Sequence, residues 1–271
     1  MHQHQLETVS FQAALGAADL PLAEIGDSRY VVRYASTAAE LDQVLRLRYE
    51  VFNVELGEGL SSSVETGRDE DRFDAVCRHL TVVERATGAV VGTYRLQTSM
   101  LAANGHGFYS ATEFDLGTLP GEVLDDAVEL GRACIAREHR NTRVLFLLWR
   151  GLAAYVTHNR KRYLFGCCSL TSQDASEGVA VAEWLAANGH SHPELSVTPR
   201  PGFECLAEDG DEAIATPSIP RLFGIYLRYG AKVCGAPAVD RAFGTIDYFV
   251  LFDVATMDRS ELRPFFTTGD R

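Results

Sequence analysis

Residues 79–96 read HLTVVERATGAVVGTYRL, in which two runs rich in β-branched residues flank Ala86-Thr-Gly88. Two such runs joined by a short glycine-containing turn are typical of a β-hairpin. The second run also carries Arg95 between Tyr94 and Leu96. A charged side chain in an apolar strand is costly to bury unless it is paired or used. The stretch therefore predicts a sheet with a polar site attached to it.

The rest of the chain predicts more strands and several helices around this hairpin. Thr37 and Glu40 fit a capping box, which opens a helix. No repeat and no domain linker is recognisable, so we expect one α+β domain over residues 29–271 after an N-terminal arm, residues 1–28. The expected strands are 29–34, 127–136, 162–168 and 248–254, and the expected helices are 37–52, 142–158, 175–187 and 221–229.

The composition is that of an ordinary globular protein, with 271 residues, 46% hydrophobic and 23% charged. The apolar run VLFLLW at 144–149 is too short to span a membrane. The first residues lack the basic region and apolar core of a secretory signal. None of the six cysteines forms a Cys-x-x-Cys pair, and no histidine pair has metal-ligand spacing. We therefore expect a cytoplasmic protein with reduced thiols and no metal.

Charged residues gather in the segments before the hairpin. Arg48 lies near the end of the first expected helix, and the loop over residues 53–77 carries the acidic residues Asp69, Asp71 and Asp74. A long loop inside a compact domain is usually functional or disordered. Such a cluster predicts either a binding site for a cationic ligand or a set of structural ion pairs.

The strand expected at 127–136 contains Glu129-Leu-Gly-Arg132. Attack of an amine on a thioester needs a neutral amine, and a carboxylate can take the proton of an ammonium directly or through water. A strand interior is where burial raises the pKa of a glutamate toward neutral pH, so Glu129 is the candidate base. Alternatively, Glu129 and Arg132 form an ion pair that only holds the strand. On a flat strand these two positions point to opposite faces, and a β-bulge at Gly131 would turn both inward.

Four spaced motifs, in this order along the chain, resemble the acyl-homoserine-lactone synthases, which have a GNAT (N-acetyltransferase-like) fold. The motifs are Arg48-x-x-x-Phe52, Asp71-x-x-Asp74, Gly92-x-x-Arg95-Leu96 and Glu129-x-x-Arg132. Longer stretches resemble the hemolysin-like ornithine acyl-[acyl carrier protein] N-acyltransferases over residues 30–254. Among them are DRFDAVCRHL (71–80), FYSATEFD (108–115), LWRGLAAY (148–155) and FGCCS (165–169). The aromatic residue expected soon after Phe52 in the lactone synthases is not a Trp here, which weakens a pocket for S-adenosylmethionine.

The resemblance implies a central mixed sheet with splayed strands flanked by helices. It also implies an enzyme that moves a long-chain, often 3-hydroxylated, fatty acyl group from acyl carrier protein to the α-amine of ornithine. This is the first step of ornithine lipid synthesis. The donor would be the acyl-phosphopantetheine of the carrier protein, with no permanently bound cofactor. In this family setting Glu129 would act as base or amine anchor, and Arg132 would support Glu129 or the thioester oxygen.

The other motif residues are candidates for substrate binding, namely Arg48, Phe52, Asp71, Asp74 and Arg95. The two aspartates could attract a cationic amino acid such as ornithine. They could equally anchor the acidic loop to the sheet through Arg48 and Arg95. Phe52 fits a packing role at least as well as a place in a pocket wall.

The segment after the Glu129 strand bears on the donor. GNAT enzymes that use coenzyme A place small residues there, so that bare amides hold a pyrophosphate at a helix start. Arg140 and Thr142 occupy those positions here, so the binding site for a pyrophosphate is incomplete. Phosphopantetheine carries a single phosphate and needs fewer backbone amides. Residues 132–162 also carry a formal charge of +7 in a chain of −12, which suits an acidic carrier protein. The candidates for pantetheine or carrier binding are Arg137, His139, Arg140, Asn141, Thr142, Arg143, Lys161 and Arg162; alternatively, the charges among them belong to a solvated helix face.

Other functions stay open or are disfavoured. The acceptor could be another amino acid or a lactone precursor, and a non-catalytic module that binds acyl carrier protein is a further alternative. The chain lacks the His-x4-Asp motif of glycerolipid acyltransferases and the Gly-x-Ser-x-Gly elbow. We expect no nucleic-acid partner. An amphiphilic product suggests transient contact with a membrane surface, although the acidic net charge opposes strong binding to anionic lipids.

Overall fold

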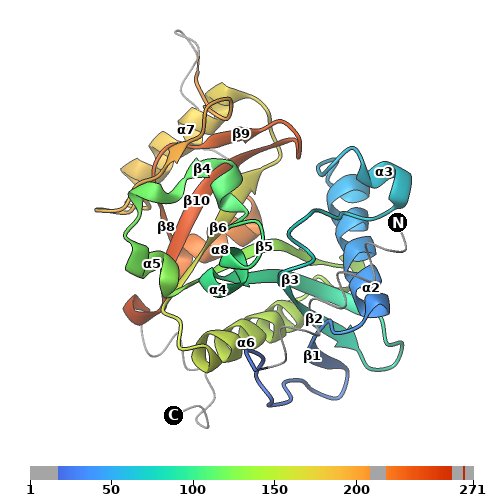
Figure 1. Ribbon diagram of the computed structural model, residues 1–271. Helices are drawn as coiled ribbons and strands as arrows, with labels where there is room; N and C mark the ends of the chain where they lie inside the picture. The colour runs from blue at the N-terminus through green and yellow to red at the C-terminus, as the bar shows by residue number, and fades with distance from the viewer. Residues whose placement is uncertain (1–17, 208–217, 258–264, 266–271) are drawn as a thin grey trace. The chain divides into compact units, whose positions relative to one another are not determined.

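The structure, a computed structural model, describes residues 18–207, 218–257 and 265. Its backbone forms two compact units that interleave along the chain (Figure 1). Unit 1 comprises Met1–Gly107, Val128–Lys161 and Asp258–Arg271, and unit 2 comprises Phe108–Ala127 and Arg162–Met257. The single domain expected over residues 29–271 stays a prediction, and each unit is described by itself. Within the described residues, no helix combines the length and the hydropathy needed to cross a membrane.

Unit 1 is built on antiparallel strands in the order β1-β2-β3-β5. The predicted hairpin is confirmed as β2 and β3. The strands are β1 (Tyr30–Tyr34), β2 (Arg78–Glu84), β3 (Val90–Thr98) and β5 (Ala127–Ile135). The helical elements are α2 (Ala38–Tyr49), the π-helical turn η1 (Glu50–Glu55), α3 (Ser63–Thr66), α4 (Ser99–Ala103), η4 (Arg137–His139) and α6 (Thr142–His158).

The two faces of this sheet carry different partners. Val144 and Leu148 of α6 approach Gly92 of β3 so closely that a Cβ there would lie 3.1 and 3.3 Å from their side chains. Because residues two apart in a strand share a face, Leu96 also points toward α6 and Arg95 points away from it. The buried guanidinium of Arg95 thus lies on the face opposite α6.

The described part of the N-terminal arm, residues 18–28, is tied to unit 1 by Asp19. Arg78 of β2 donates from Nε and Nη2 to the Asp19 carboxylate at 2.9 and 2.7 Å. The Tyr155 hydroxyl of α6 donates to the same carboxylate at 3.3 Å, and the Asn159 amide donates to the Asp19 carbonyl. Since Arg78 is buried, Asp19 neutralises a charge that has little contact with water.

Unit 2 is built on a long antiparallel pair, β6 (Tyr163–Leu170) and β10 (Thr245–Asp253). β8 (Lys232–Val233) and β9 (Ala238–Asp240) also pair with β10, and parallel bridges at Ser191–Val233 and Val197–Gly235 make the arrangement mixed. The remaining elements are η2 (Ser110–Thr112), β4 (Phe114–Asp115) with its partner β7 (Thr198–Pro199), η3 (Leu116–Thr118), α5 (Gly121–Asp125), α7 (Ala175–Ala187), α8 (Arg221–Arg228) and η5 (Val254–Thr256).

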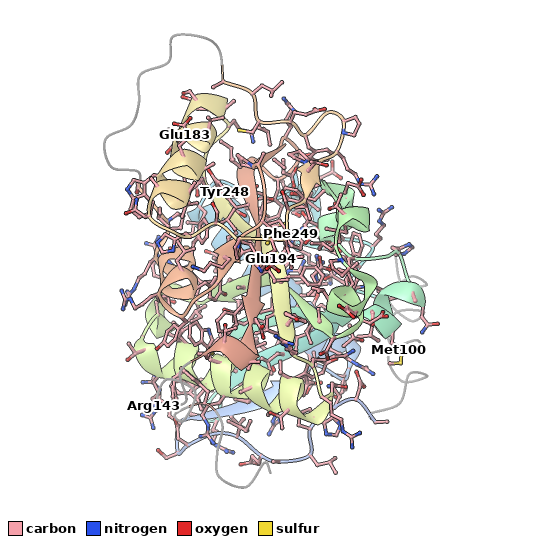
Figure 2. All side chains as sticks on the ribbon, turned by 90° about the vertical axis from the view of Figure 1, so that its left-hand side faces the viewer. Met100, Arg143, Glu183, Glu194, Tyr248 and Phe249 are labelled. Carbon is pink, nitrogen blue, oxygen red and sulfur yellow. The ribbon has the colours of Figure 1, made fainter. Side chains whose placement is uncertain are left out.

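The two faces of the β6–β10 pair bury two different clusters. Tyr248 lies in a core with Val181 of α7 and Phe223 of α8. Its neighbour Phe249 packs instead with Phe114, on the opposite face (Figure 2). Side chains alternate along a strand, so Asp247, two residues before Phe249, shares the face of Phe249.

The predicted strands and long helices are confirmed, and the capping box of Thr37 and Glu40 is present at the start of α2. β10 begins at Thr245, three residues earlier than the sequence pattern indicates. The structure also contains α3, α4, α5 and β4, which lie outside the strands and helices that the sequence predicts. Elements this short have no room for a periodic hydrophobic pattern, which explains why the pattern does not show them.

Candidate active site

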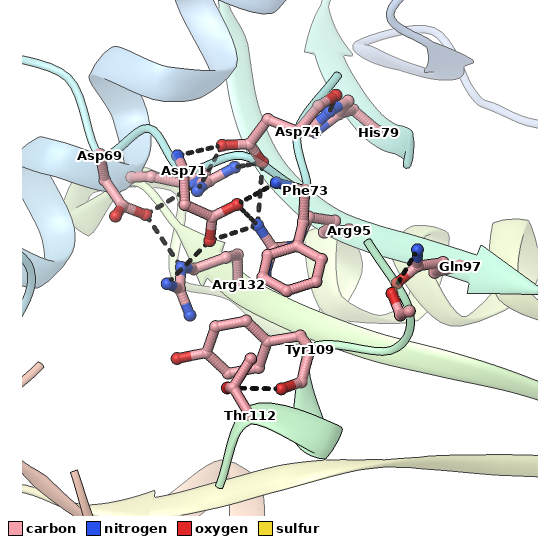
Figure 3. A network of polar contacts seen from close by, with 12 residues as sticks. Asp69, Asp71, Phe73, Asp74, His79, Arg95, Gln97, Tyr109, Thr112 and Arg132 are labelled. Atoms are coloured by element: carbon pink, nitrogen blue, oxygen red, sulfur yellow. Dashed lines mark hydrogen bonds and ion pairs between the residues drawn. The ribbon is translucent and has the colours of Figure 1, made fainter. Parts of the chain in front are cut away.

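A network of buried ion pairs joins α2 to the acidic loop in unit 1 (Figure 3). Arg48, at 0% exposure, donates from Nε to Asp69 Oδ2 and from Nη1 to Asp74 Oδ1, both at 2.7 Å. Burial alone would raise the pKa of the Asp74 carboxyl, but Arg48 and Arg95 outweigh it and hold that pKa well below its usual range. Asp74 is therefore ionised at neutral pH and attached to α2.

Arg95 and Arg132 extend the network from the strands. Arg95 Nη1 lies 2.7 Å from Asp71 Oδ1 and 3.0 Å from Asp74 Oδ1. Arg132 reaches Asp69 and Asp71, each at 3.2 Å. Three arginines thus face three aspartates, and the formal charges of these six side chains balance. These contacts match the expectation that the aspartates anchor the loop, and direct contact of the aspartates with a substrate stays a prediction.

Backbone groups fix the shape of the acidic loop. Asp74 Oδ2 accepts a hydrogen bond from the Asp71 amide at 2.8 Å, and Asp71 Oδ1 accepts one from the Phe73 amide at 2.8 Å. The Asp69 amide donates to the Leu45 carbonyl of α2 at 3.1 Å. Aspartate favours such local turns because its short carboxylate reaches nearby backbone amides. The loop is therefore ordered by the same carboxylates that bind the arginines.

The β-bulge expected near Gly131 is present in β5. Thr93 pairs with Cys134 and Arg95 pairs with Gly131, so two residues of β5 stand opposite one residue of β3. The left-handed backbone falls on Arg132, with φ of 49°, rather than on the glycine. A non-glycine residue in this conformation costs about 1–2 kcal/mol, which the ion pairs of its side chain help to offset.

Glu129 lies on the same face as Arg95 because it stands opposite Gln97 in the register of β3 and β5. Its side chain is buried, with 5% exposure. The bulge brings Arg132 to this face as well, as its contacts with Asp69 and Asp71 show. Glu129 and Arg132 therefore share one side of the sheet, as the bulge hypothesis required, and their catalytic roles stay predictions.

His79 is a buried histidine next to the network. It stands opposite Arg95 in the register, and its Nε2 donates to the Asp74 carbonyl at 3.1 Å. Burial lowers the pKa of His79 to about 4. The imidazole is thus neutral in the folded protein at neutral pH.

This shift predicts a pH dependence of stability. Below the ordinary histidine pKa of about 6.5 the unfolded chain binds a proton at His79 that the folded chain does not. The free energy of unfolding should therefore fall as pH drops from about 6.5 to about 4, by a total of about 3 kcal/mol from this group. Urea titrations at several pH values should show a shallower slope for His79→Gln. Equal slopes for the wild type and His79→Gln would contradict the prediction.

Phe52 lies in the π-helical turn η1, which continues α2. Its carbonyl accepts a hydrogen bond from the Glu58 amide at 2.8 Å, and Gly57 and Gly59 follow with left-handed φ values of 70° and 90°. Single π-helical turns are frequently found at functional sites. A place for Phe52 in a substrate pocket stays a prediction.

The basic residues after β5 are largely paired with carboxylates. Arg140 binds Glu55 through both terminal nitrogens, and Arg137 lies 3.3 Å from the same carboxylate. Arg143 pairs with Asp27 at 2.6 Å. These pairs are exposed at the arginine end, and such pairs are weak enough to exchange partners. Their presence reduces the positive charge on this surface without removing the arginines from contact with solvent.

The other predicted donor-site residues have structural contacts of their own. The Tyr30 hydroxyl and His139 Nδ1 are hydrogen-bonded at 2.9 Å. The Asn141 side chain accepts from the Val144 amide and caps α6, whose first residue is Thr142. In unit 2, Arg162 pairs with Asp253 at 2.6 Å. The Lys161 amide donates a hydrogen bond to the Val156 carbonyl in the last turn of α6. Binding of pantetheine or a carrier protein by this set stays a prediction.

Two groups of polar residues were not predicted from the sequence. One is the Asp19–Arg78 pair, whose members lie 59 positions apart. The other is a cluster in unit 2 formed by Glu113, Cys167 and Asp247. One carboxylate oxygen of each acid and the thiol sulfur lie within 4.8 Å of one another. The available signal was a carboxylate next to apolar residues, as in Glu113-Phe114 and Asp247-Tyr248.

Comparisons with known proteins bear on the fold and on the family. A family described as acetyltransferase (GNAT) domain matches residues 47–150, and this match confirms the predicted GNAT fold. The splay of its central strands stays a prediction. Among solved structures, the acyl-homoserine-lactone synthase LasI is 15% identical, with a TM-score of 0.45, covering 84% of this chain and 91% of that chain.

Curated relatives cover most of the chain. An L-ornithine N(alpha)-acyltransferase of Rhizobium meliloti is 34% identical over 237 residues, which are 82% of this chain and 79% of that protein. The protein of the same name from Brucella abortus is 33% identical, covering 82% and 84%. The one from Rhodobacter capsulatus is 34% identical, covering 88% and 95%.

Proposed function

Because this chain belongs to the L-ornithine N(alpha)-acyltransferase family, we propose that it transfers a (3-hydroxy) fatty acyl group from acyl carrier protein to the α-amine of ornithine. The chain is an acyltransferase with a GNAT domain. The identity to these relatives over more than four fifths of the chain carries the proposal. The product would be a lyso-ornithine lipid, formed in the first step of ornithine lipid synthesis.

Glu129 is the group that we assign to proton transfer. Buried on the face that also carries Arg95, it would take a proton from the α-ammonium of the acceptor, directly or through a water molecule. The neutral amine would then attack the thioester carbonyl, forming the C–N bond. When the tetrahedral intermediate collapses, the C–S bond breaks and the pantetheine thiolate leaves and takes up a proton.

Arg132 is assigned to positioning. Its guanidinium is held by Asp69 and Asp71, and its backbone forms the bulge three residues after Glu129. A side chain held by two carboxylates fixes the left-handed backbone and hence the position of the neighbouring strand residues. The network of three arginines and three aspartates thereby fixes the position of β5, the strand that carries the proposed base.

We assign the donor to acyl carrier protein on the basis of the chain between β5 and α6. Arg140 and Thr142 occupy positions where enzymes using coenzyme A have small residues, and η4 precedes the capped start of α6. The arginines of this segment could exchange their exposed carboxylate partners for those of an acidic carrier protein. A protein with this donor and an amphiphilic product would act in the cytoplasm, with transient contact to the membrane surface.

The proposal is tested by incubating the purified chain with a 3-hydroxyacyl carrier protein and single amino acids. We expect mass spectrometry to show N-acylornithine and an equal amount of thiol released from the carrier protein. The matching acyl-coenzyme A should give a much lower kcat/KM. Acylation of other amino acids but not ornithine would overturn the acceptor. Carrier binding without thiol release would instead support the non-catalytic module.

A further inference from the structure

Gln97 of β3 is a buried polar residue beside the proposed base. It stands directly opposite Glu129 of β5 in the strand register, and both residues belong to unit 1. Side chains of directly paired residues lie on the same face of a sheet, with their Cβ atoms about 5 Å apart. Gln97 is 1% exposed and Glu129 is 5% exposed. An amide and a carboxylate therefore lie side by side with little contact with water.

A hydrogen bond fixes the orientation of the Gln97 amide (Figure 3). Its Nε2 donates to the Gly107 carbonyl oxygen at 3.1 Å. The Gly107 amide in turn donates to the Ala102 carbonyl of α4 at 3.0 Å, and α4 follows β3 directly along the chain. Because a carbonyl oxygen accepts only from the nitrogen of a glutamine amide, Gln97 Oε1 is the atom that remains for another partner.

This remaining oxygen lacks a hydrogen-bond donor. Gln97 Oε1 is buried and has no hydrogen-bond partner among the residues that the structure describes. An amide oxygen has two lone pairs, and burying it without a donor costs about 1–3 kcal/mol. An ionised carboxylate carries only acceptors, so Glu129 in that form does not serve as the donor. A ligand group with several N–H donors next to both side chains removes the cost.

We propose that Gln97, together with Glu129, binds the α-ammonium group of the amino-acid acceptor. The inference rests on the proposed function and adds to it a residue that positions the attacking nitrogen. An α-ammonium carries three N–H donors. Glu129 takes the proton of one of them, and Gln97 Oε1 accepts a hydrogen bond from another, both before this transfer and in the neutral amine that remains. An amide oxygen is too weak a base to take the proton itself, so the two acceptors have separate tasks.

Other partners fit Gln97 Oε1 less well than the α-ammonium. The thioester offers only acceptors at its reacting carbon, namely the carbonyl oxygen and the sulfur. A water molecule offers two donors and no charge, whereas hydrogen bonds with an ionised donor are about twice as strong as neutral ones. Ornithine also carries a side-chain ammonium. The assignment to the α-ammonium follows from Glu129, which takes the proton of the nitrogen that becomes acylated.

The test compares L-ornithine with 5-aminopentanoate, which keeps the carboxylate and the side-chain ammonium but lacks the α-amine. Isothermal titration calorimetry on the wild-type chain should give a lower Kd for ornithine by about 10- to 100-fold. Gln97→Met keeps the length of the side chain without its amide. It should raise the Kd for ornithine about 5- to 20-fold, while the Kd for 5-aminopentanoate stays within about twofold.

Three further variants control this comparison. Gln97→Glu keeps an acceptor oxygen beside Glu129 and should retain the preference for ornithine. Gln97→Asn draws the amide back by one methylene and should act in the same direction as Gln97→Met, so it replaces that variant if the methionine chain does not fold. The matched control Gln43→Met removes an exposed glutamine amide of α2 in the same unit and should keep both wild-type Kd values.

Steady-state kinetics with a 3-hydroxyacyl carrier protein give a second readout. The KM for ornithine should rise about 5- to 20-fold in Gln97→Met, while the KM for the loaded carrier protein stays within about twofold. If Gln97 only held Gly107 to the sheet, its loss would change the two KM values alike or unfold the chain, which circular dichroism detects. Equal changes in both KM values would therefore overturn the inference.

The outcomes separate this inference from the proposed function. Wild-type acylation of ornithine with an unchanged preference for ornithine in the folded Gln97 variants would overturn the inference and leave the function standing. A wild-type chain that acylates no amino acid would refute the function, and the binding preference would still report on Gln97. Weaker binding of 5-aminopentanoate and ornithine alike in Gln97→Met would mean that Gln97 does not discriminate the α-ammonium, which also overturns the inference.

Discussion

Replacing Arg48 with alanine should lower the free energy of unfolding by about 3–5 kcal/mol, because it leaves two buried carboxylates without their main partner. Arg48 is fully buried and contacts Asp69 and Asp74 at 2.7 Å. Arg95 and Arg132 still reach these aspartates, but they cannot occupy the vacated position between α2 and the loop. Urea unfolding followed by circular dichroism measures the loss.

Arg46→Ala is the matched control for this prediction. Arg46 lies in the same helix two residues earlier, and its pair with Asp42 is exposed at the arginine end. Exposed pairs of this kind contribute about 0.3–0.5 kcal/mol, so the control should be nearly as stable as the wild type. Similar losses for the two variants would show that the buried network does not hold α2 to the loop.

Replacing Glu129 with glutamine should lower kcat for ornithine acylation by about 10²- to 10⁴-fold, since the amide cannot accept the proton of the α-ammonium. Glutamine has nearly the same shape, so the variant should stay folded, and its affinity for acyl carrier protein should stay close to that of the wild type. Steady-state release of carrier thiol measures kcat, and calorimetry measures carrier affinity.

A second carboxylate variant separates catalysis from general charge effects. Glu65→Gln changes an exposed side chain of α3 in the same unit and should leave kcat unchanged. If Glu129→Gln retained wild-type kcat, another group would have to take the proton. If it lost stability and carrier binding together with activity, Glu129 would be a structural residue.

The sequence was informative where a local pattern has one physical solution. The hairpin of β2 and β3 followed from two β-branched runs around a glycine-containing turn. The bulge followed from a conflict, because Glu129 and Arg132 could share a face only if β5 gained an extra residue. The expected pairing of Arg48 and Arg95 with the acidic loop followed from the cost of burying charge in apolar sequence.

What the sequence did not show depends on contacts between distant segments. Asp69 was one acidic residue among several, and nothing local distinguished it as the partner of Arg48 and Arg132. Asp247 and Glu113 meet only because β10 and the segment before β4 fold onto one face of the β6–β10 pair. The left-handed conformation fell on Arg132 although glycine is the usual choice. The ion pairs of the Arg132 side chain explain this conformation, which the intrinsic backbone preferences of the residues do not predict.

The interleaving of the two units sets an order of events during translation. Strands β1, β2 and β3 are synthesised before β5, because residues 108–127, which belong to unit 2, are made in between. The face of β3 that α6 covers stays open until residue 158 has emerged. A nascent chain halted between β3 and β5 would expose this hairpin to chaperones and to other unfinished chains. For the same reason, no single contiguous gene fragment encodes either unit on its own.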